Sequence, residues 1–462
     1  MNTQFPLSKN QFDIYIDQMK WRDGSHFNIG AIITILGQFD IDCFNIALNK
    51  HWLNHPGLRT RIDEFNGKPV QIITEYRDEK VTVVDFSSYI DGEKRARDYI
   101  QNDFQKPFLL NQDSQLVYFQ IVKFGKDQHF CYGKFHHIVV DGWATSLVFD
   151  KVISYYNQIK RNNEPSKIEY DFTLVDYLQG ESDYLKSNRF TKDKDYWNNR
   201  LKGVSSKIFP EVQQLQLKGS RQEIYISREQ YNSVEALCQQ VQSNAFHFIL
   251  AIILIYLNKR YLQNDLVVGL PILNRSKKAY KQSIALFISM LPFRVEINGK
   301  ETISDILSKI RTSLKQDYRH QRFPLGEMKR SAGLNAESHE SLFEVTLSYE
   351  KHNYSLDFAN TQTTCSPLYS GQQKVPLAIY VREFDNNSDV KIDFDYNQYN
   401  FDSETIAQIV KHFQKLFDDA LKDFEQEIFQ LSPLLDLERQ HLISKQFISK
   451  PFQMPKILIV SL

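Results

Sequence analysis

Apolar and polar residues follow two different periods along the chain, and their alternation predicts interleaved strands and helices. Residues 31–40 form a β-branched run that ends in a glycine turn, which is typical of a strand. Residues 115–124 and 129–137 flank a Gly-Lys-Asp-Gln turn and predict a hairpin. Residues 143–160 place apolar side chains at helical spacing, so we expect an amphipathic helix directly after the hairpin.

The second half of the chain repeats this mixture of patterns. A new β/α run begins near Ser220, includes the apolar stretches 265–275 and 283–297, and ends in a helix at about residues 402–421. The most apolar run, residues 246–257, is too short to cross a bilayer and predicts a buried core helix. A chain of 462 residues exceeds the usual size of one hydrophobic core. The sequence therefore predicts an α/β protein with two lobes.

Charge and cysteine content exclude several classes of protein. Lys+Arg and Asp+Glu number 56 each, so the chain lacks the basic excess that is typical of proteins that bind nucleic acid. Its cysteines (Cys43, Cys131, Cys238, Cys365) form no CxxC pair, which argues against a disulfide framework and a zinc site. The N-terminus has neither a basic start nor an apolar core, so it does not predict a secretory signal. We expect a cytoplasmic protein that binds neither nucleic acid nor membrane as its principal ligand.

The stretch FHHIVVDGWA, residues 135–144, joins the predicted hairpin to the following helix. His136 and His137 are neighbours in a strand, so their side chains point to opposite faces and only one of them can face a given cleft. Gly142 permits the expected turn. Asp141 lies just before that turn, where its carboxylate is placed to pair with a distant arginine.

Two interpretations of this motif are open from the residues alone. The first is a buried histidine with satisfied hydrogen bonds and a surface aspartate at a helix start, because short patterns arise by chance. The second is a site in which a neutral histidine accepts a proton from an attacking amine, hydroxyl or thiol, or holds that nucleophile. The chain has no GxSxG elbow and no reactive-cysteine signature. Direct transfer between two bound substrates therefore fits better than a covalent intermediate.

The motif HHIVVDGW resembles the HHxxxDG signature of the condensation domains of nonribosomal peptide synthetases, within the chloramphenicol-acetyltransferase-like superfamily. Other segments resemble further motifs of that family and follow in the family's order. They are PLSKNQFDIY (6–15), NHPGLRTRI (54–62), DYWNNRLKG (195–203), VGLPILNR (268–275), IALFISMLPFR (284–294) and HQRFPLGEM (320–328). The chain departs from the family at Ala285, where glycine is usual, and at Ser289, where asparagine is common.

The resemblance implies an α/β fold of two α+β two-layer lobes. These chloramphenicol-acetyltransferase-like lobes would form a V-shaped pseudo-dimer around a central tunnel. Residues 1–177 would form the N-terminal lobe with the HHxxxDG motif, and residues 178–430 the C-terminal lobe. Residues 431–462 would form a tail that begins like the linker leading to an adenylation domain.

The resemblance also implies a role for each residue of the motif. His137 would orient or deprotonate an amine, and the Gly142 N–H would stabilise the developing oxyanion. Asp141 would pair with Arg59, and His136 would support the site from behind. The residues that would lie along the tunnel are Trp143, which we expect mainly at the lobe interface, Ser289 and Ser348.

The implied function is amide formation between a donor acyl thioester and the amine of a carrier-bound aminoacyl thioester. The partners would be donor and acceptor carrier proteins whose phosphopantetheine arms hold the substrates, together with a downstream adenylation domain if the chain is part of a longer synthetase. The chain itself would bind no cofactor and no metal. The match begins close to Met1, which suits a starter-type or stand-alone domain. The alternatives are an acyltransferase that uses coenzyme A thioesters and a degenerate domain that only docks carriers.

Overall fold

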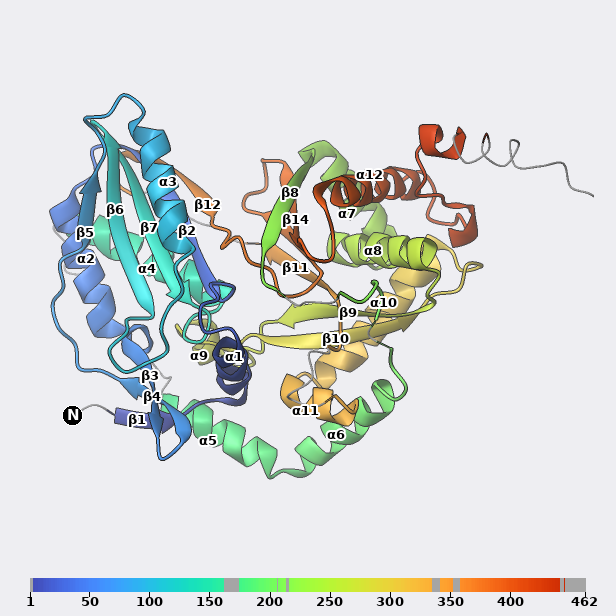
Figure 1. The fold of residues 1–462 in the computed structure, drawn as a ribbon, viewed down its shortest axis with the longest axis horizontal. Coiled ribbons are helices and arrows are strands. Elements are labelled where there is room, and N and C mark those ends of the chain that lie inside the picture. Colours follow the sequence, from blue (N-terminus) through green and yellow to red (C-terminus); the bar gives the residue numbers. More distant parts are fainter. Residues whose placement is uncertain are drawn as a thin grey trace, which may run out of the picture.

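The structure of the protein is a computed structural model with two lobes side by side (Figure 1). We call the lobe that contains the N-terminal half of the chain the first lobe and the other the second lobe. Each lobe has one main β-sheet with helices packed on it, which confirms the predicted two-lobe α/β architecture. The structure describes residues 3–161, 174–205, 207–212, 216–334, 341–351, 358–440 and 444.

The first lobe is built on a five-stranded sheet in the order β12-β2-β7-β6-β5. Apolar residues of α2 and α4 form a core on one face of this sheet, and those of α3 form a smaller core on the other face. The predicted strand at 31–40 and the predicted hairpin are confirmed as β2, β6 and β7. The bounds are β2 Asn28–Gly37, α2 Ile41–Asn54, β5 Thr82–Asp85, α3 Gly92–Phe104, β6 Val117–Gly125, β7 Gln128–His136, α4 Gly142–Lys160 and β12 Thr361–Pro367.

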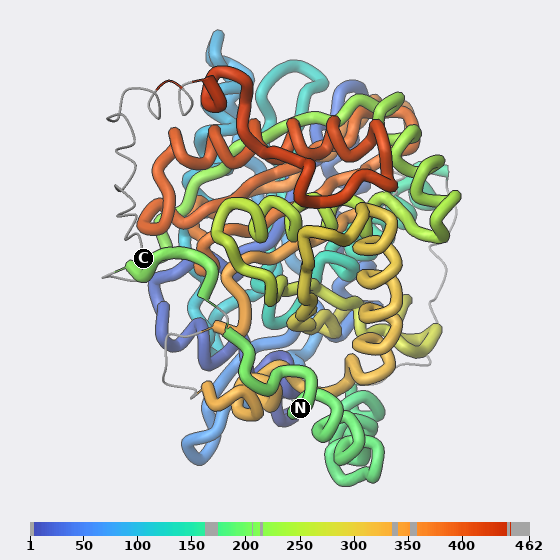
Figure 2. The backbone as a smooth tube through the Cα atoms, turned by 90° about the vertical axis from the view of Figure 1, so that its right-hand side faces the viewer, coloured from blue at the N-terminus to red at the C-terminus, as the bar shows by residue number. Residues whose placement is uncertain are grey.

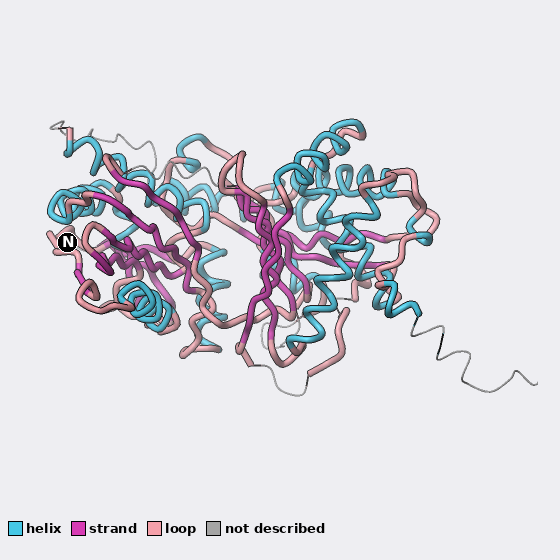
Figure 3. Tube along the Cα trace, turned by 90° about the horizontal axis from the view of Figure 1, so that it is seen from above, coloured by secondary structure: helices cyan, strands magenta, loops and turns pink. Residues whose placement is uncertain are grey.

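The second lobe is built on a six-stranded sheet in the order β10-β9-β11-β13-β14-β8. Helices α7, α8, α10 and α12 cover the face that points away from the first lobe, as Figures 2 and 3 show from two sides. Helix α8 is buried on almost every side, which confirms the predicted core helix. The bounds are β8 Gly219–Ile226, α7 Arg228–Gln240, α8 Ala245–Tyr261, β9 Asp265–Ile272, β10 Ser289–Glu296, α10 Ile303–Arg319, β11 Val345–Lys351, β13 Leu377–Glu383, β14 Val390–Asn397 and α12 Ser403–Ala420.

Several segments connect the two lobes. Helices α5 and α6 run along one edge of the molecule from the first lobe to the second (Figure 1). Strand β12 lies within the range predicted for the C-terminal lobe, but it pairs antiparallel with β2 of the first lobe. A small sheet in the order β1-β4-β3 lies at the same end of the molecule as α5. The remaining bounds are β1 Thr3–Pro6, α1 Lys9–Lys20, η1 Pro56–Arg59, β3 Thr60–Phe65, β4 Lys68–Ile73, α5 Leu174–Leu185, α6 Asn188–Arg200, α9 Lys278–Lys281, α11 Leu325–Ser331 and η2 Ile428–Gln430.

Some predictions cannot be compared with the structure. The predicted boundary at 177 falls within α5, so no break in the chain marks it. Most of the predicted tail 431–462 lies outside the described residues, which end at 440 apart from residue 444.

Among the described residues, no single helix has both the length and the apolar composition of a membrane span. Helices α7 and α8 reach these values only as a pair that is bent by 95°.

Candidate functional site

The HHIVVDG motif forms the turn between the last residue of β7 and the first turn of α4. Asp141 is the N-cap of α4, and its Oδ1 accepts a hydrogen bond of 2.7 Å from the Ala144 N–H. Aspartate is favoured at this position because its carboxylate satisfies an N–H that has no partner within the helix. The cap therefore fixes where the helix starts and leaves its N-terminus close to the two histidines.

Asp141 also joins the two lobes through a buried ion pair with Arg275, a residue of the second lobe. The Arg275 Nη2 donates to Asp141 Oδ1 at 2.8 Å and to Oδ2 at 3.0 Å, and both side chains are almost completely buried. The backbone N–H groups of Phe287 and Ile288 donate to Asp141 Oδ2 at 2.9 and 3.2 Å. One carboxylate of the first lobe thus accepts hydrogen bonds from three groups of the second lobe. We call this set of contacts the interlobe clamp.

Arg275 organises the second-lobe side of the interlobe clamp. Its guanidinium donates to the carbonyls of Tyr280, Ser283 and Ala285 and lies 4.4 Å from the centroid of the Phe287 ring. Burial lowers the pKa of Arg275, and the nearby charge of Asp141 opposes that change. The arginine therefore holds the whole loop that presents Phe287 and Ile288 to Asp141.

The predicted pairing of Asp141 with Arg59 is wrong. Arg59 ends the 3-10 turn η1, and its guanidinium donates to the carbonyls of Trp52 and Thr74 within the first lobe. Arg59 also lines a cavity of about 380 Å³ together with Arg61 and other residues. The true partner, Arg275, is the last residue of the VGLPILNR segment. The sequence motif therefore contained this arginine, but it did not show that the arginine pairs with Asp141.

His136 lies behind the site, where it is completely buried. Its Nδ1 accepts a hydrogen bond of 3.1 Å from the Ile138 N–H, and its Nε2 lies 3.2 Å from Gln18 Oε1. Because Nδ1 accepts, Nε2 must carry the proton that is donated to Gln18. Burial lowers the pKa of His136 to about 3, and the neighbouring His137 and His26 add to this effect. His136 is therefore a neutral group that holds the turn, which is the supporting place expected for it.

The depressed pKa of His136 predicts a pH-dependent stability. The unfolded chain binds a proton at His136 below pH about 6.5, whereas the folded protein does so only near pH 3, so stability falls as the pH drops through this window. We expect the free energy of unfolding to fall by about 2 kcal/mol more between pH 7 and pH 5 in the wild type than in His136→Gln. Urea unfolding at both pH values measures this difference. Equal pH dependence in the two proteins would show that His136 is not buried as a neutral group.

His137 follows the last residue of β7 and is partly exposed, whereas His136 is buried. Its backbone N–H donates to the Phe27 carbonyl at 2.9 Å, and its Nδ1 makes no hydrogen bond to a described residue. Burial lowers the pKa of His137, while the charges of Asp141 and Glu350 act in the opposite direction. The ring is therefore neutral at pH 7 and retains a nitrogen that can accept a proton.

Gly142 is the first residue of α4, at the positive end of the helix dipole. Its φ is not positive, so the turn does not use the left-handed conformation that glycine favours. A Cβ at Gly142 would meet no atom within 4 Å, which leaves open space over the backbone. A substrate oxygen can therefore approach the helix N-terminus closely at this residue.

The three residues expected along a tunnel lie in different settings. The Trp143 Nε1 donates to the Lys281 carbonyl of the second lobe at 2.9 Å, so its indole bridges the lobes. Ser289 is buried at the start of β10, next to Ile288 of the interlobe clamp. Ser348 is half-buried on β11. The tunnel itself stays a prediction.

Sequence reasoning missed two polar residues of α1 that also connect the site. The Asn10 Nδ2 donates to the Phe287 and Ile288 carbonyls at 3.2 and 3.1 Å, so the clamp loop is bound at both its N–H and its carbonyl groups. The Gln11 Nε2 donates to the Ile138 carbonyl at 3.1 Å, inside the HHIVVDG turn. Both residues belong to the PLSKNQFDIY segment, but the polar face of a helix does not show in the sequence which residues it will contact.

Within the described part of the chain, no group of three or more His, Cys, Asp or Glu residues could hold a metal ion.

Solved structures with the same fold include two kinds of condensation domain. The starter condensation domain of rhizomide synthetase, solved in complex with C8-CoA, aligns with a TM-score of 0.83 at 22% identity over 93% of this chain and 98% of that one. The first condensation domain of the calcium-dependent antibiotic synthetase, in complex with a substrate analogue, gives a TM-score of 0.82 at 17% identity over 94% of this chain and 99% of that one. At these identities the likeness shows the fold.

Sequence comparison gives the family. The chain is 26% identical to surfactin synthase subunit 1 of Bacillus subtilis (strain 168), over 96% of this chain and 12% of that protein. It is also 26% identical to a dimodular nonribosomal peptide synthase of the same organism, over 96% of this chain and 18% of that protein. The chain thus spans less than a fifth of the length of either relative. The family model for the condensation domain matches residues 1–443, so the chain belongs to the condensation domain family.

Proposed function

We propose that this protein forms an amide bond between the acyl group of a donor thioester and the amine of an acceptor aminoacyl thioester. The observation that carries the proposal is the position of His137. A neutral imidazole with an unbonded nitrogen lies beside the N-terminus of α4, and the buried Asp141–Arg275 pair holds that turn against the second lobe. A proton acceptor and a site for negative charge are thus fixed next to each other.

The reaction is a direct transfer. The acceptor nitrogen attacks the donor carbonyl carbon, a C–N bond forms, and the C–S bond of the donor thioester breaks. His137 orients the amine and accepts its proton, which then leaves with the departing thiolate as a thiol. The Gly142 N–H and the positive end of α4 stabilise the negative charge on the carbonyl oxygen. Holding both substrates between two clamped lobes replaces a bimolecular encounter and supplies much of the acceleration.

We further propose that donor and acceptor arrive on the phosphopantetheine arms of carrier proteins. The likeness to surfactin synthase subunit 1 and to a dimodular nonribosomal peptide synthase supports this assignment. A coenzyme A thioester is the second candidate donor, because the similar rhizomide starter domain was solved with C8-CoA.

An experiment with two donors separates these candidates. An acceptor carrier loaded with alanine is incubated with the protein and either an octanoyl-loaded donor carrier or octanoyl-CoA, and the acceptor carrier is analysed by mass spectrometry. We expect acylated acceptor in the carrier reaction at a rate at least tenfold above the coenzyme A reaction. A faster reaction with octanoyl-CoA would favour the coenzyme A donor. Binding of both carriers without product from a series of donors would instead support a docking domain.

A further inference from the structure

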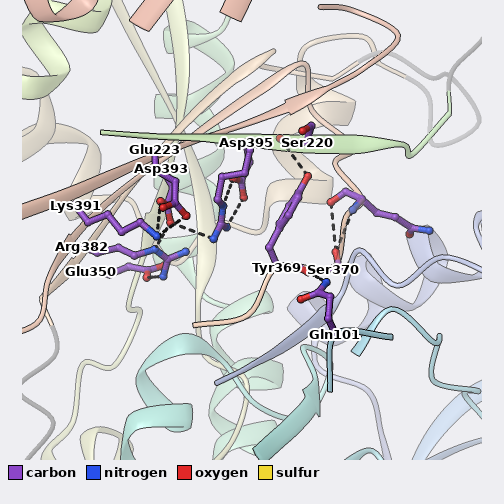
Figure 4. A network of polar contacts seen from close by, with 12 residues as sticks. Gln101, Ser220, Glu223, Glu350, Tyr369, Ser370, Arg382, Lys391, Asp393 and Asp395 are labelled. Carbon is purple, nitrogen blue, oxygen red and sulfur yellow. Dashed lines mark hydrogen bonds and ion pairs between the residues drawn. The ribbon is translucent and has the colours of Figure 1, made fainter. Parts of the chain in front are cut away.

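The face of the second-lobe sheet that points to the first lobe carries a row of charged side chains (Figure 4). Side chains alternate along each strand, so residues such as Leu347 enter the core while their neighbours face the first lobe. The face is continuous across β11, β13, β14 and β8. We call its charged residues the ionic row: Glu350 on β11, Arg382 on β13, Lys391, Asp393 and Asp395 on β14, and Arg221 and Glu223 on β8.

The ionic row is linked from end to end by ion pairs. Arg382 pairs with Glu350 on one side and with Asp393, at 2.8 Å, on the other. The Arg221 Nη1 lies 3.2 Å from Asp393 Oδ2, and its Nε lies 2.6 Å from Asp395 Oδ1. Lys391 links Glu223 to the rest of the row. Its Nζ lies 2.6 Å from Glu223 Oε1 and 3.2 Å from Asp393 Oδ1.

The ionic row has more negative than positive groups. The carboxylates of Glu223, Glu350, Asp393 and Asp395 share the cations of Arg221, Arg382 and Lys391, so four negative groups meet three positive ones and the formal charge is −1. The central members Arg382, Asp393 and Asp395 are buried, and a charge without a full counter-charge is costly there. An additional cation at this face would therefore be bound favourably.

Glu350 is the member of the ionic row that is placed to receive such a cation. Arg382 holds one carboxylate oxygen, Oε2, while Oε1 makes no hydrogen bond to a described residue. The side chain is 23% exposed, in contrast to the completely buried Asp393. Glu350 faces the first lobe, which carries His137, and its charge acts to raise the pKa of that histidine.

We propose that the Glu350 carboxylate binds a substrate ammonium group and positions it opposite His137. The inference rests on the proposed function, in which an aminoacyl acceptor brings its α-amino group to this histidine. A protonated amine enters as the missing cation of the ionic row and loses one proton to solvent water to reach the nucleophilic form. The neutral amine then attacks the donor and passes its next proton to His137. A basic side chain of the substrate carries the same chemistry, so the experiment includes an arm for it. Glu350 is thus a positioning residue that selects for a cationic acceptor.

The test measures binding rather than turnover. The probes are three unreactive pantetheine amides: alanyl, with an α-ammonium group, propionyl, with none, and 6-aminohexanoyl, with an ammonium group at the side-chain end. Calorimetry gives their affinities for the wild-type protein and for Glu350→Gln, whose amide oxygen can still accept from Arg382. Glu223→Gln is the matched control, because it removes one charge from the same row at its exposed edge.

We expect the wild type to bind the alanyl probe at least tenfold more tightly than the propionyl probe. Glu350→Gln should lose this preference, Glu350→Asp should keep part of it, and Glu223→Gln should keep it within twofold. If Glu350→Gln instead lost a preference for the 6-aminohexanoyl probe over the propionyl probe, the site would be assigned to a basic side chain of the substrate. Equal preference for the alanyl probe in Glu350→Gln and Glu223→Gln, with no change for the 6-aminohexanoyl probe, would overturn the inference. Because no product is measured, the result is independent of whether the protein condenses its substrates.

Discussion

Replacing His137 with alanine is expected to lower the rate of amide formation about 100- to 10,000-fold. The variant loses the only imidazole of the motif with an unbonded nitrogen, because both nitrogens of His136 are held by Gln18 and Ile138. Single-turnover reactions with donor- and acceptor-loaded carriers measure the chemical step directly. The expected loss lies in this step, and the affinity for the donor carrier should stay within about twofold.

His129→Ala provides the matched control. His129 lies near the start of β7, at the opposite end of the strand from the HHIVVDG turn. It should keep the rate within a few-fold of the wild type. If His137→Ala retained more than a tenth of the wild-type rate, the ring would only hold substrate by contact, and its role in proton transfer would be lost.

Removing Asp141 is expected to have the largest effect on stability. Asp141→Ala leaves Arg275 as a buried charge without a partner, and it frees the Ala144, Phe287 and Ile288 N–H groups. Breaking a buried pair in this way costs about 3–5 kcal/mol of unfolding free energy. Urea unfolding of Asp141→Ala and Arg275→Ala should show losses of this size.

The double variant distinguishes the interlobe clamp from two separate effects. Asp141→Ala and Arg275→Ala should together cost less than the sum of the single losses, because each already breaks the same pair. Arg59→Ala is the control, since its guanidinium contacts only backbone carbonyls of its own lobe among the described residues. Losses that add for Asp141 and Arg275 but couple for Asp141 and Arg59 would contradict the pairing.

Much of the fold could be predicted from the sequence because apolar periodicity is a local property. Helix α8 is apolar on all sides, and the β6–β7 hairpin has a short turn between two apolar runs, so both elements were expected close to their observed bounds. Strand β12 could not be predicted in the same way. Its sequence, TQTTCSP, is polar, and its partner β2 lies far away along the chain, so no local pattern shows the pairing.

The site could be predicted only in part, for a related physical reason. The positions of His136, His137 and Asp141 relative to one another are set by one strand end and one helix cap, which the sequence shows. The partner of Asp141 is 134 residues away along the chain, and no local pattern distinguishes Arg275 from Arg59. Glu350 was missed because an acidic residue on a strand is equally typical of a solvent-facing edge.

The most direct test of the account is intact-protein mass spectrometry of an acceptor carrier after incubation with a donor-loaded carrier. We predict that the wild-type protein transfers the donor acyl group, so that the acceptor carrier gains its mass, and that His137→Ala does not do so on the same timescale. Transfer at the same rate by His137→Ala, or no transfer by the wild type with any of a series of acyl donors while both carriers bind, would contradict it.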